Sequence, residues 1–363
     1  MAFTHQVGGH DSTILASPLS SSTLIKPASA RELAFYQHLG PSLADGEFVA
    51  VWTPAFYGTL KLEGRVAQNG SVDKLDQDPH VEPEMLVLEN LTHRFVRPNV
   101  LDVKLGTVLY DEDASPEKQE RMRKAAESST SGTTGIRLTG FQVWDTTSQS
   151  YHKTSKSFGR TLLSHELPRG LSRFFYPPSS ALSTAEKSSS SSTSPSSSSA
   201  STPSSASSST SSTPIPPASH PHPLPLDLLL PVLRTLVRRL DTLSDLLSTL
   251  EVRIRGGSLL FIVEGDPDAL EAALVRSQQP DEDEDSDAES VSTTDGDGNA
   301  APHTRQAFEM RLIDFAHTRD ATGEGCDEGV VLGVRTLRRL IGELVAELEA
   351  KLAQEREGQE ARN

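Results

Sequence analysis

Short apolar runs alternate with turns that contain glycine or proline over the first ninety residues of the chain. The runs lie at residues 13–15, 23–26, 48–52 and 85–88. Because turn-forming residues bound each run, we expect four short strands. Residues 31–39 predict one short helix with Leu33, Phe35 and Tyr36 as its buried positions. This part of the chain therefore predicts a small antiparallel sheet with a helix packed on it.

Helices and strands alternate in the next part of the chain. Apolar strands are predicted at residues 100–105 and 136–144. Ser115 can cap a helix that begins with Pro116 and continues to about residue 128. An aromatic-rich helix end follows at residues 171–176.

A repeat of leucines marks the last third of the chain. From Leu233 to Leu250 they recur at helical spacing, which predicts a long amphipathic helix that ends at Gly256-Gly257. Two apolar strands are expected at residues 258–264 and 310–315, and a terminal amphipathic helix at 332–352.

Two segments lack the apolar side chains that a packed core needs. Residues 179–222 are almost entirely Ser, Thr, Pro and Ala, and residues 277–305 contain the acidic run 281–287. Burial cannot offset the entropy of ordering such segments, so we expect both to be disordered. The remaining residues predict a two-lobed α+β fold with a ligand cleft between the lobes. The expected N-lobe is 1–92, and the expected C-lobe is built from 93–178, 223–276 and 306–363.

Composition narrows the class of protein. A formal net charge of −16 argues against direct binding of nucleic acid by a broad basic surface. Cys326 is the single cysteine, which leaves no disulfide framework and no cysteine-rich zinc site. No stretch approaches about 18 uninterrupted apolar residues, so no membrane anchor is expected. A soluble, intracellular monomer is the expectation.

Four polar positions interrupt apolar strands or lie at their ends. Asp102 and Lys104 lie two apart on a strand and share one face, either as a structural ion pair or as groups that bind a hydroxyl and a phosphate. Asp314 follows a strand, where it either makes a turn or holds Mg²⁺. Lys26 ends a strand after the turn 8–12, and such a lysine can neutralise ATP phosphates.

Basic side chains gather on the helix after Ser115. Lys118, Arg121 and Lys124 are three residues apart along one side of this helix. They form either a solvated basic face or a cationic wall that binds a ligand with several phosphates. Lys156 and Arg160 follow in the sequence, and His317 lies close after Asp314. The sequence has no G-x-G-x-x-G loop, Walker motif, H-R-D or D-F-G, which argues against a protein kinase.

In order along the chain, these segments resemble the inositol polyphosphate kinase family. The family signature P-x-x-x-D-x-K-x-G is present as PNVLDVKLG at residues 98–106. Further similar segments are LVLENL (86–91), ASPEKQERM (114–122), SGTTGIRLTGFQVW (131–144), FGR (158–160), GLSRFF (170–175), GGSLLFIVEGD (256–266) and RLIDFAHT (311–318). The short stretch between the signature and Ile136 is similar to the multikinase branch.

The resemblance implies a fold related to protein kinases and ATP-grasp enzymes, with ATP and Mg²⁺ as cofactors. It implies that Lys26 contacts ATP phosphates, that Glu89 and Leu91 form the adenine-binding hinge, and that Asp102 reaches the ribose and the reacting groups. Asp314 would hold Mg²⁺ with Ser258 close by, and Lys104 would contact the substrate and the transferred phosphoryl group. Inositol phosphates would be recognised by Lys118, Arg121, Lys124, Lys156, Arg160 and His317.

The implied reaction converts inositol 1,4,5-trisphosphate to tetrakis- and pentakisphosphates. A trisphosphate 3-kinase or a hexakisphosphate kinase of the same family remains the alternative, and the headgroup of phosphatidylinositol 4,5-bisphosphate is a less favoured acceptor. The family also implies residence in the nucleus and cytoplasm. A role as a scaffold for transcription-regulatory proteins is a further reading, in which the acidic run is either an interaction tail or merely solvating.

Overall fold

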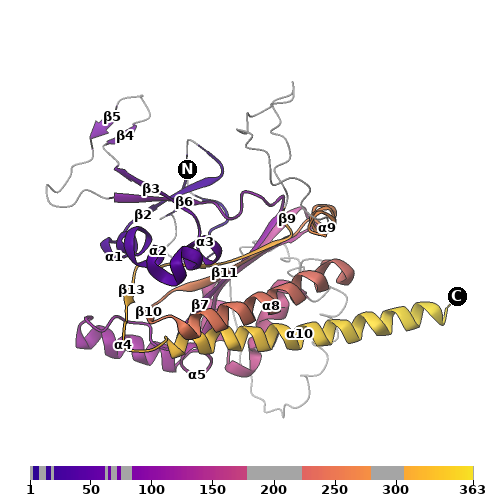
Figure 1. Cartoon of the computed structure of the whole chain (residues 1–363). Helices are drawn as coiled ribbons and strands as arrows, with labels where there is room; N and C mark the ends of the chain where they lie inside the picture. Colours follow the sequence, from indigo (N-terminus) through magenta and orange to yellow (C-terminus); the bar gives the residue numbers. More distant parts are fainter. Residues whose placement is uncertain are drawn as a thin grey trace, which may run out of the picture.

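Two antiparallel sheets, each packed against helices, form two lobes that face one another in the computed structural model (Figure 1). The structure describes residues 3–7, 14–17, 20–61, 64–66, 72–74, 84–177, 223–278 and 306–362. Almost all of the two segments expected to be disordered, and the turn at 8–12, therefore lie outside the described residues. The lobe boundaries expected from the sequence stay a prediction.

The N-lobe contains a four-stranded sheet in the order β1-β2-β6-β3. Its strands are β1 (Leu15–Ala16), β2 (Thr23–Pro27), β3 (Phe56–Lys61) and β6 (Glu84–Glu89). A succession of short helical segments follows β2: α1 (Ala30–Ala34), η1 (Phe35–Leu39), α2 (Gly40–Ser42), η2 (Leu43–Gly46) and α3 (Glu47–Trp52). A separate strand pair is formed by β4 (Gly64–Val66) and β5 (Val72–Lys74).

The strand predicted at residues 48–52 is wrong, because these residues form helix α3. Phe48 and Trp52, four residues apart, are both buried, whereas Val51 is exposed. That spacing places two aromatic rings on one helical face. Periodicity over five residues cannot separate a strand from a helix, which is why so short an apolar run does not predict its structure.

The C-lobe is organised around a five-stranded sheet in the order β12-β11-β7-β8-β9. Its strands are β7 (Pro98–Leu105), β8 (Ile136–Asp145), β9 (Ser150–Thr154), β11 (Ser258–Glu264) and β12 (Phe308–Ile313). Its helices are α4 (Pro116–Glu127), α5 (Ser131–Thr134), α6 (Lys156–Thr161), η3 (Ser164–Glu166), α7 (Leu167–Phe175), α8 (Leu226–Thr249), α9 (Pro267–Arg276) and α10 (Glu328–Glu360). Strands β10 (Val252–Ile254) and β13 (Thr318–Asp320) pair with each other.

The leucine repeat builds the core beneath the C-lobe sheet. Helices α8 and α10 run side by side there (Figure 1), and the repeating leucines of α8 are buried in the core. Burying one leucine side chain contributes about 1.5–3 kcal/mol, so this stripe is a large part of the stabilisation. Helix α8 ends at Thr249 rather than at Gly256-Gly257, because Leu250 adopts an extended conformation before β10. Ser115 caps α4 as predicted, with its hydroxyl accepting a hydrogen bond from the Lys118 N–H.

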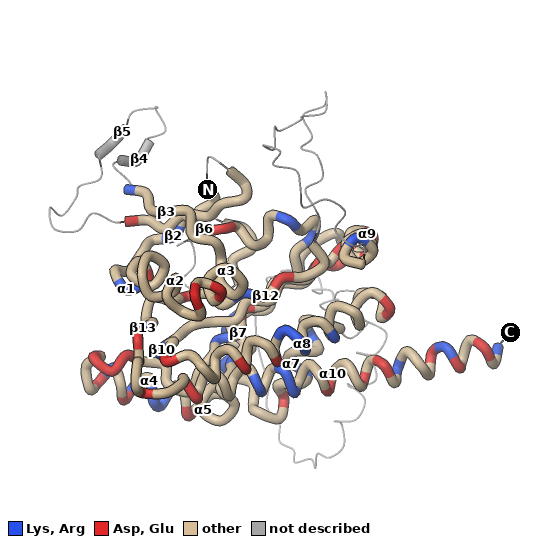
Figure 2. Tube along the Cα trace, in the orientation of Figure 1, with Lys and Arg blue, Asp and Glu red and all other residues tan. Residues whose placement is uncertain are grey.

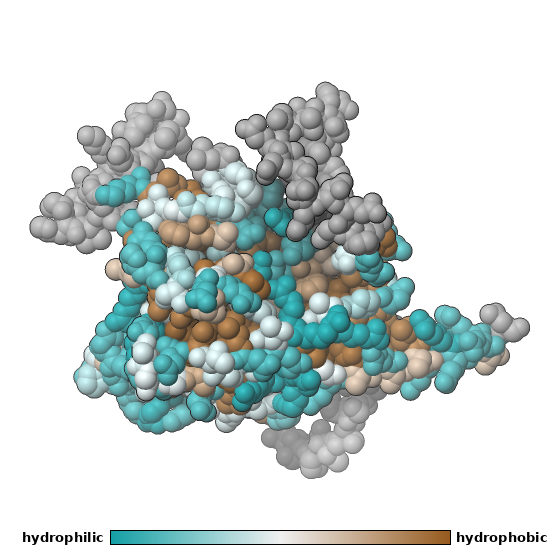
Figure 3. Space-filling view, in the orientation of Figure 1, coloured by the Kyte–Doolittle hydropathy of each residue, from teal (hydrophilic) through white to brown (hydrophobic). Residues whose placement is uncertain are grey.

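Helix α10 is longer than the sequence predicted and leaves the body of the protein. Asp327 caps its start, and the residues beyond Leu352 are exposed. Acidic and basic side chains alternate along this last part (Figure 2), and its surface is mostly hydrophilic (Figure 3). In the part of the chain that the structure describes, no helix has the length and apolar character to cross a bilayer.

Aromatic stacking joins the two lobes. The ring of Phe35 in η1 lies 3.8 Å from that of Phe315, which follows β12, with 9° between the two planes. Both side chains are fully buried. This contact holds Glu32 in α1 close to Asp314, the residue before Phe315, and both side chains line the space between the lobes.

Candidate functional site

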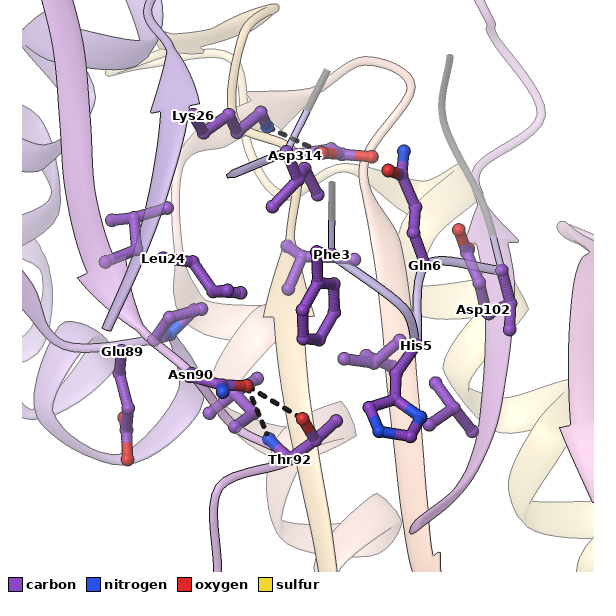
Figure 4. Close-up of a pocket in the computed structure, with 18 of the residues that line it drawn as sticks. Phe3, His5, Gln6, Leu24, Lys26, Glu89, Asn90, Thr92, Asp102 and Asp314 are labelled. Atoms are coloured by element: carbon purple, nitrogen blue, oxygen red, sulfur yellow. Dashed lines mark hydrogen bonds and ion pairs between the residues drawn. The ribbon is translucent and has the colours of Figure 1, made fainter. Parts of the chain in front are cut away.

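A cavity of about 290 Å³ lies between the lobes. Its walls are largely apolar: Leu24, Leu88 and Leu91 come from the N-lobe, and Val100, Leu260 and Ile313 come from the C-lobe. Charged side chains, among them Lys26, Asp102 and Asp314, line the same cavity (Figure 4). An apolar slot with a few charged groups suits a flat ring that carries a charged tail.

The N-terminal segment 3–7 completes one wall of the cavity, and the sequence reasoning missed it. The Phe3 ring points into the space (Figure 4), and the Phe3 N–H donates to the Ile14 carbonyl at 3.2 Å. Nδ1 of His5 lies 2.7 Å from Nε2 of Gln142 in β8. Burial, and then the charge of Lys153, lowers the pKa of His5. Alternation of Phe3, His5 and Val7 before the glycine pair was the available signal for an extended segment.

The chain that leaves β6 forms the back of the cavity. Glu89 and Leu91, predicted from the family resemblance as hinge residues, both line it. The Glu89 carboxylate turns away from the cavity (Figure 4) and accepts a hydrogen bond from the Ala55 N–H at 3.2 Å. Asn90 stiffens the turn, because its Oδ1 accepts from the Thr92 hydroxyl at 2.8 Å and its N–H donates to the Ser22 carbonyl. The backbone at Glu89 and Leu91 is therefore what this segment can present to a ligand.

An ion-paired network connects the lobes at the charged end of the cavity. Nζ of Lys26 lies 2.8 Å from Asp314 Oδ1 and 2.8 Å from Glu32 Oε1. Although burial alone lowers the pKa of Lys26, the two carboxylates raise it well above its usual value. Burial acts to raise the pKa of Asp314, but Lys26 and then Lys104 lower it, so this carboxylate is ionised. Asp314 also has a backbone φ of 67°, a left-handed conformation that non-glycine residues rarely adopt and that redirects the chain after β12.

Asp102 occupies a buried position on β7 beside this network. Burial and the charge of Asp314 raise the pKa of Asp102 to about 6, against the opposing charge of Lys104. The neighbouring Ser258 and Thr139 hydroxyls act to lower the pKa of Asp102, yet Asp102 Oδ1 and the Ser258 hydroxyl are buried without a hydrogen bond of normal geometry among the described residues. Buried polar groups that are only partly satisfied are costly and rare in a native protein, so this group of side chains marks a place where a ligand can bind.

A row of polar residues crosses the C-lobe sheet next to Asp102. Ser258 of β11 pairs with Lys104 of β7, and Lys104 pairs with Arg137 of β8. Because directly opposite residues in paired strands share one face, all three side chains lie on the face that carries Asp102. The Lys104 ammonium donates a hydrogen bond to the Gly256 carbonyl. Arg137 was not singled out from the sequence, although it lies in the matched segment 131–144.

The remaining predicted side chains lie on elements outside the row of Ser258, Lys104 and Arg137. On α4, Lys118 is half-buried and Arg121 is exposed, whereas Lys124 is 69% exposed and lies 3.2 Å from Glu120. Lys156 and Arg160 are on α6. Nδ1 of His317 lies 2.7 Å from Asp111 Oδ2. The structure thus places Lys26, Asp102 and Asp314 together in one cavity, and the recognition roles of the outer residues stay a prediction.

The residues present fit a divalent cation that arrives with phosphate groups. No cluster of three or more His, Cys, Asp or Glu side chains able to hold a metal ion exists within the described residues. Asp314, which is ion-paired with Lys26, and Asp102 instead provide two neighbouring carboxylates. Mg²⁺ is commonly held by one or two carboxylates together with substrate phosphates and water.

Comparison with known proteins agrees with these features. A sequence profile described as inositol polyphosphate kinase matches residues 85–194 and 227–342. The inositol polyphosphate multikinase of Saccharomyces cerevisiae is 32% identical over 383 aligned residues, with 92% of this chain and 95% of that protein covered. The inositol polyphosphate multikinase of Schizosaccharomyces pombe is 30% identical over 173 residues, with 48% and 62% covered.

A solved structure is similar over most of its length. The crystal structure of the S. cerevisiae inositol phosphate multikinase in complex with ADP and Mn²⁺ gives a TM-score of 0.58 at 25% identity. The match covers 89% of this chain and 99% of that one. The two-lobed α+β fold expected from the sequence is therefore confirmed.

Proposed function

The chain belongs to the inositol polyphosphate kinase family, and on this premise we propose that it transfers the γ-phosphoryl group of ATP to hydroxyl groups of inositol phosphates. The acceptor sequence proposed is inositol 1,4,5-trisphosphate, then a tetrakisphosphate, then a pentakisphosphate. The relatives named as multikinases support this choice of branch over a trisphosphate 3-kinase or a hexakisphosphate kinase.

The observation that carries the proposal is one continuous site with two chemically different parts. The apolar cavity ends at Lys26, Asp314 and Asp102, and the polar row of Ser258, Lys104 and Arg137 begins on the same sheet face. Adenine fits the apolar part, and the triphosphate would then point toward the charged end. An acceptor on the row would meet the terminal phosphate there, which is the arrangement that phosphoryl transfer requires.

Each side chain at the junction has a distinct proposed role. Lys26 and Lys104 would offset negative charge on the phosphates, since both carry ammonium groups near the reacting region. Asp314 would hold the cation, which we propose to be Mg²⁺, and the bound cation would neutralise further phosphate charge. Asp102, with a pKa of about 6, would orient the attacking hydroxyl and accept its proton.

The open form of the acceptor side supports a multikinase. Arg121 and Lys124 on α4 are exposed and Lys118 is half-buried, so these three side chains present an open basic surface to an acceptor. A ring bound mainly through its phosphates can present different hydroxyls to the nucleotide. Residence in the nucleus and cytoplasm, and transcription-regulatory partners that bind the acidic run 281–287, are further proposals that rest on the family resemblance.

The test is turnover of purified protein with Mg-ATP and inositol 1,4,5-trisphosphate, with products separated by anion-exchange chromatography. Conversion through tetrakis- to pentakisphosphate, lost in Lys104→Ala and Asp314→Ala, is the expected result. Accumulation of a single tetrakisphosphate would assign the chain to the trisphosphate 3-kinase branch. Turnover of hexakisphosphate alone would assign it to the hexakisphosphate kinases, and turnover of neither would contradict the proposal.

A further inference from the structure

Arg137 lies at the end of the polar row that is farthest from the nucleotide cavity. It faces Lys104 directly across the β7–β8 pair, and Lys104 faces Ser258 across β7–β11. Asp102 pairs with Gly140 and Val103 pairs with Leu138, so Thr139 is an extra, bulged residue of β8. Beyond this bulge Arg137 pairs with Lys104, and its side chain therefore lies on the cavity face of the sheet. Its neighbours Ile136 and Leu138 point to the opposite face and are buried in the core.

Helix α6 brings a second guanidinium to the same end of the row. The pairing of β8 with β9 stops at Phe141–Thr154, and α6 packs along the β8 edge that this leaves. A Cβ at Gly159 would lie 1.7 Å from the Leu138 carbonyl oxygen, so only glycine permits this approach. Arg160, the exposed residue after Gly159, is thereby brought to the end of β8 that carries Arg137, and burial, then the charge of Arg160, lowers the pKa of Arg137.

Neither guanidinium is neutralised by the protein. Within the described part of the chain, Arg137 and Arg160 form no salt bridge and no side-chain hydrogen bond, although Arg137 is only partly accessible. Asp102 is the one carboxylate whose charge acts on Arg137, and no salt bridge joins the two side chains in the described part of the chain. Two like charges held together without a partner destabilise the ligand-free protein unless an anion joins them.

We propose that Arg137 and Arg160 form a phosphate-binding subsite for the acceptor, at the end of the row opposite the nucleotide. The ligand is a phosphomonoester on a polyphosphorylated cyclitol, and the assignment rests on the proposed function. Guanidinium groups bind phosphate oxygens in a bidentate manner, which suits this ligand. Adjacent strands are about 4.8 Å apart, so Ser258 and Arg137 are on the order of 10 Å apart. A six-membered ring with phosphates on opposite carbons spans a distance of that order.

The subsite has a definite kinetic consequence. It holds a phosphate away from the reacting hydroxyl, so it contributes to acceptor binding and to the choice of ring orientation. It does not touch ATP. Loss of either guanidinium should therefore raise the KM for the acceptor while the KM for ATP stays constant, and it should change the ratio of tetrakisphosphate isomers formed.

The variants are Arg137→Gln, Arg160→Gln and Arg137→Lys. The control is Arg239→Gln, which removes a partly buried arginine from α8 beside Trp52. We expect the acceptor KM to rise about 10- to 100-fold in each Gln variant, with partial recovery in Arg137→Lys and no change in the control. The melting temperature of ligand-free Arg137→Gln should equal or exceed that of the unmodified protein, because the variant relieves repulsion.

Binding is measured separately from turnover by the rise in melting temperature with inositol 1,4,5-trisphosphate. This rise should shrink in both Gln variants, including under conditions without ATP. An unchanged rise and an unchanged acceptor KM in both variants would overturn the subsite while leaving the kinase function intact. Absence of turnover in the unmodified protein would overturn the proposed function alone, since the binding measurement still tests the subsite.

A second acceptor distinguishes the source of the phosphate. The same variants are assayed with vesicles that contain phosphatidylinositol 4,5-bisphosphate. A loss confined to soluble inositol phosphates assigns the subsite to free cyclitols, and an equal loss with vesicles assigns it to the shared headgroup. A loss confined to vesicles would overturn the assignment to an inositol phosphate acceptor.

Discussion

The two ends of the site hold their positive charges in opposite ways. At the nucleotide end, Lys26 is paired with two carboxylates, and its pKa is raised. At the acceptor end, Arg137 lies beside another arginine without a paired carboxylate, and its pKa is lowered. The nucleotide end is therefore electrostatically complete without ligand and contributes to stability. The acceptor end carries two positive charges without a salt-bridged carboxylate among the described residues, and an anionic ligand would balance them.

This contrast connects stability with function. A lysine held by Glu32 and Asp314 already has a defined position in the ligand-free protein, so positioning it for catalysis should cost little at the time of binding. The unpaired Arg137 gains more from its ligand, because its charge is partly desolvated and lies close to that of the exposed Arg160. The predictions below test this difference, beginning with the largest effect.

Replacing Lys26 by Met should destabilise the ligand-free protein by about 3 kcal/mol, because Glu32 would be left buried and unpaired. Urea unfolding followed by circular dichroism measures this. The matched variant Lys26→Met/Glu32→Gln should recover most of the stability and none of the kinase activity. Equal unfolding midpoints for the single variant and the unmodified protein would show that the nucleotide end is not a stabilising ion network.

Replacing Asp314 by Asn should lower kcat by about 10²- to 10³-fold, the usual effect of removing one group that stabilises transition-state charge. Asparagine has nearly the same size and shape as aspartate, so the fold should survive. Steady-state kinetics at saturating ATP and acceptor measure the effect. Asp320→Asn, at the exposed end of β13, is the control and should stay within twofold; similar losses in both variants would argue against a specific role for Asp314.

Replacing Asp111 by Asn should raise the acceptor KM about 5- to 10-fold with little change in kcat. Asp111 lies 2.7 Å from the His317 ring and 3.3 Å from Arg31 of the N-lobe, so it holds in place the histidine that is predicted to bind the acceptor. Titration of initial rate against acceptor concentration separates KM from kcat. The more exposed Asp113→Asn also loses an ion pair with Arg31 but does not contact His317, and an equal effect there would assign the change to Arg31.

The smallest effect concerns acid sensitivity away from the site. Hydrogen bonds from Arg319, then other donors including Arg255, lower the pKa of Glu112 to about 2 from its usual 4.5. A lowered folded-state pKa gives stabilisation that is present above pH 4.5 and is lost as the pH falls toward 2. Because Glu112 is 48% exposed, solvent limits its contribution to below about 1 kcal/mol. Unfolding of Glu112→Gln should thus differ from the unmodified protein at pH 6 and converge with it at acid pH; a difference that grows on acidification would refute the assignment.

The local sequence pattern was sufficient to predict the helices and strands that have strong signals, such as a cap or a long apolar run. Strand β11 spans the predicted residues 258–264, and α4 begins at the predicted Ser115 cap. Alternation, capping and the leucine repeat act between residues close in the sequence, so they can be read without tertiary structure. Weak or short signals were insufficient: residues 48–52 are helical, and strand β10 lies where the sequence predicts the end of the preceding helix.

The sequence by itself determined the fold class, the family and the identity of most polar candidates, because the signature 98–106 and the strands around it are local patterns. Tertiary structure alone decided which candidates meet. Lys26 and Asp314 are 288 residues apart yet form one ion pair, and Arg137 joins Lys104 only through strand register. Register and lobe closure depend on long-range packing, and a bulge in β8 changes the face of every residue before it. No periodicity in the chain encodes that choice.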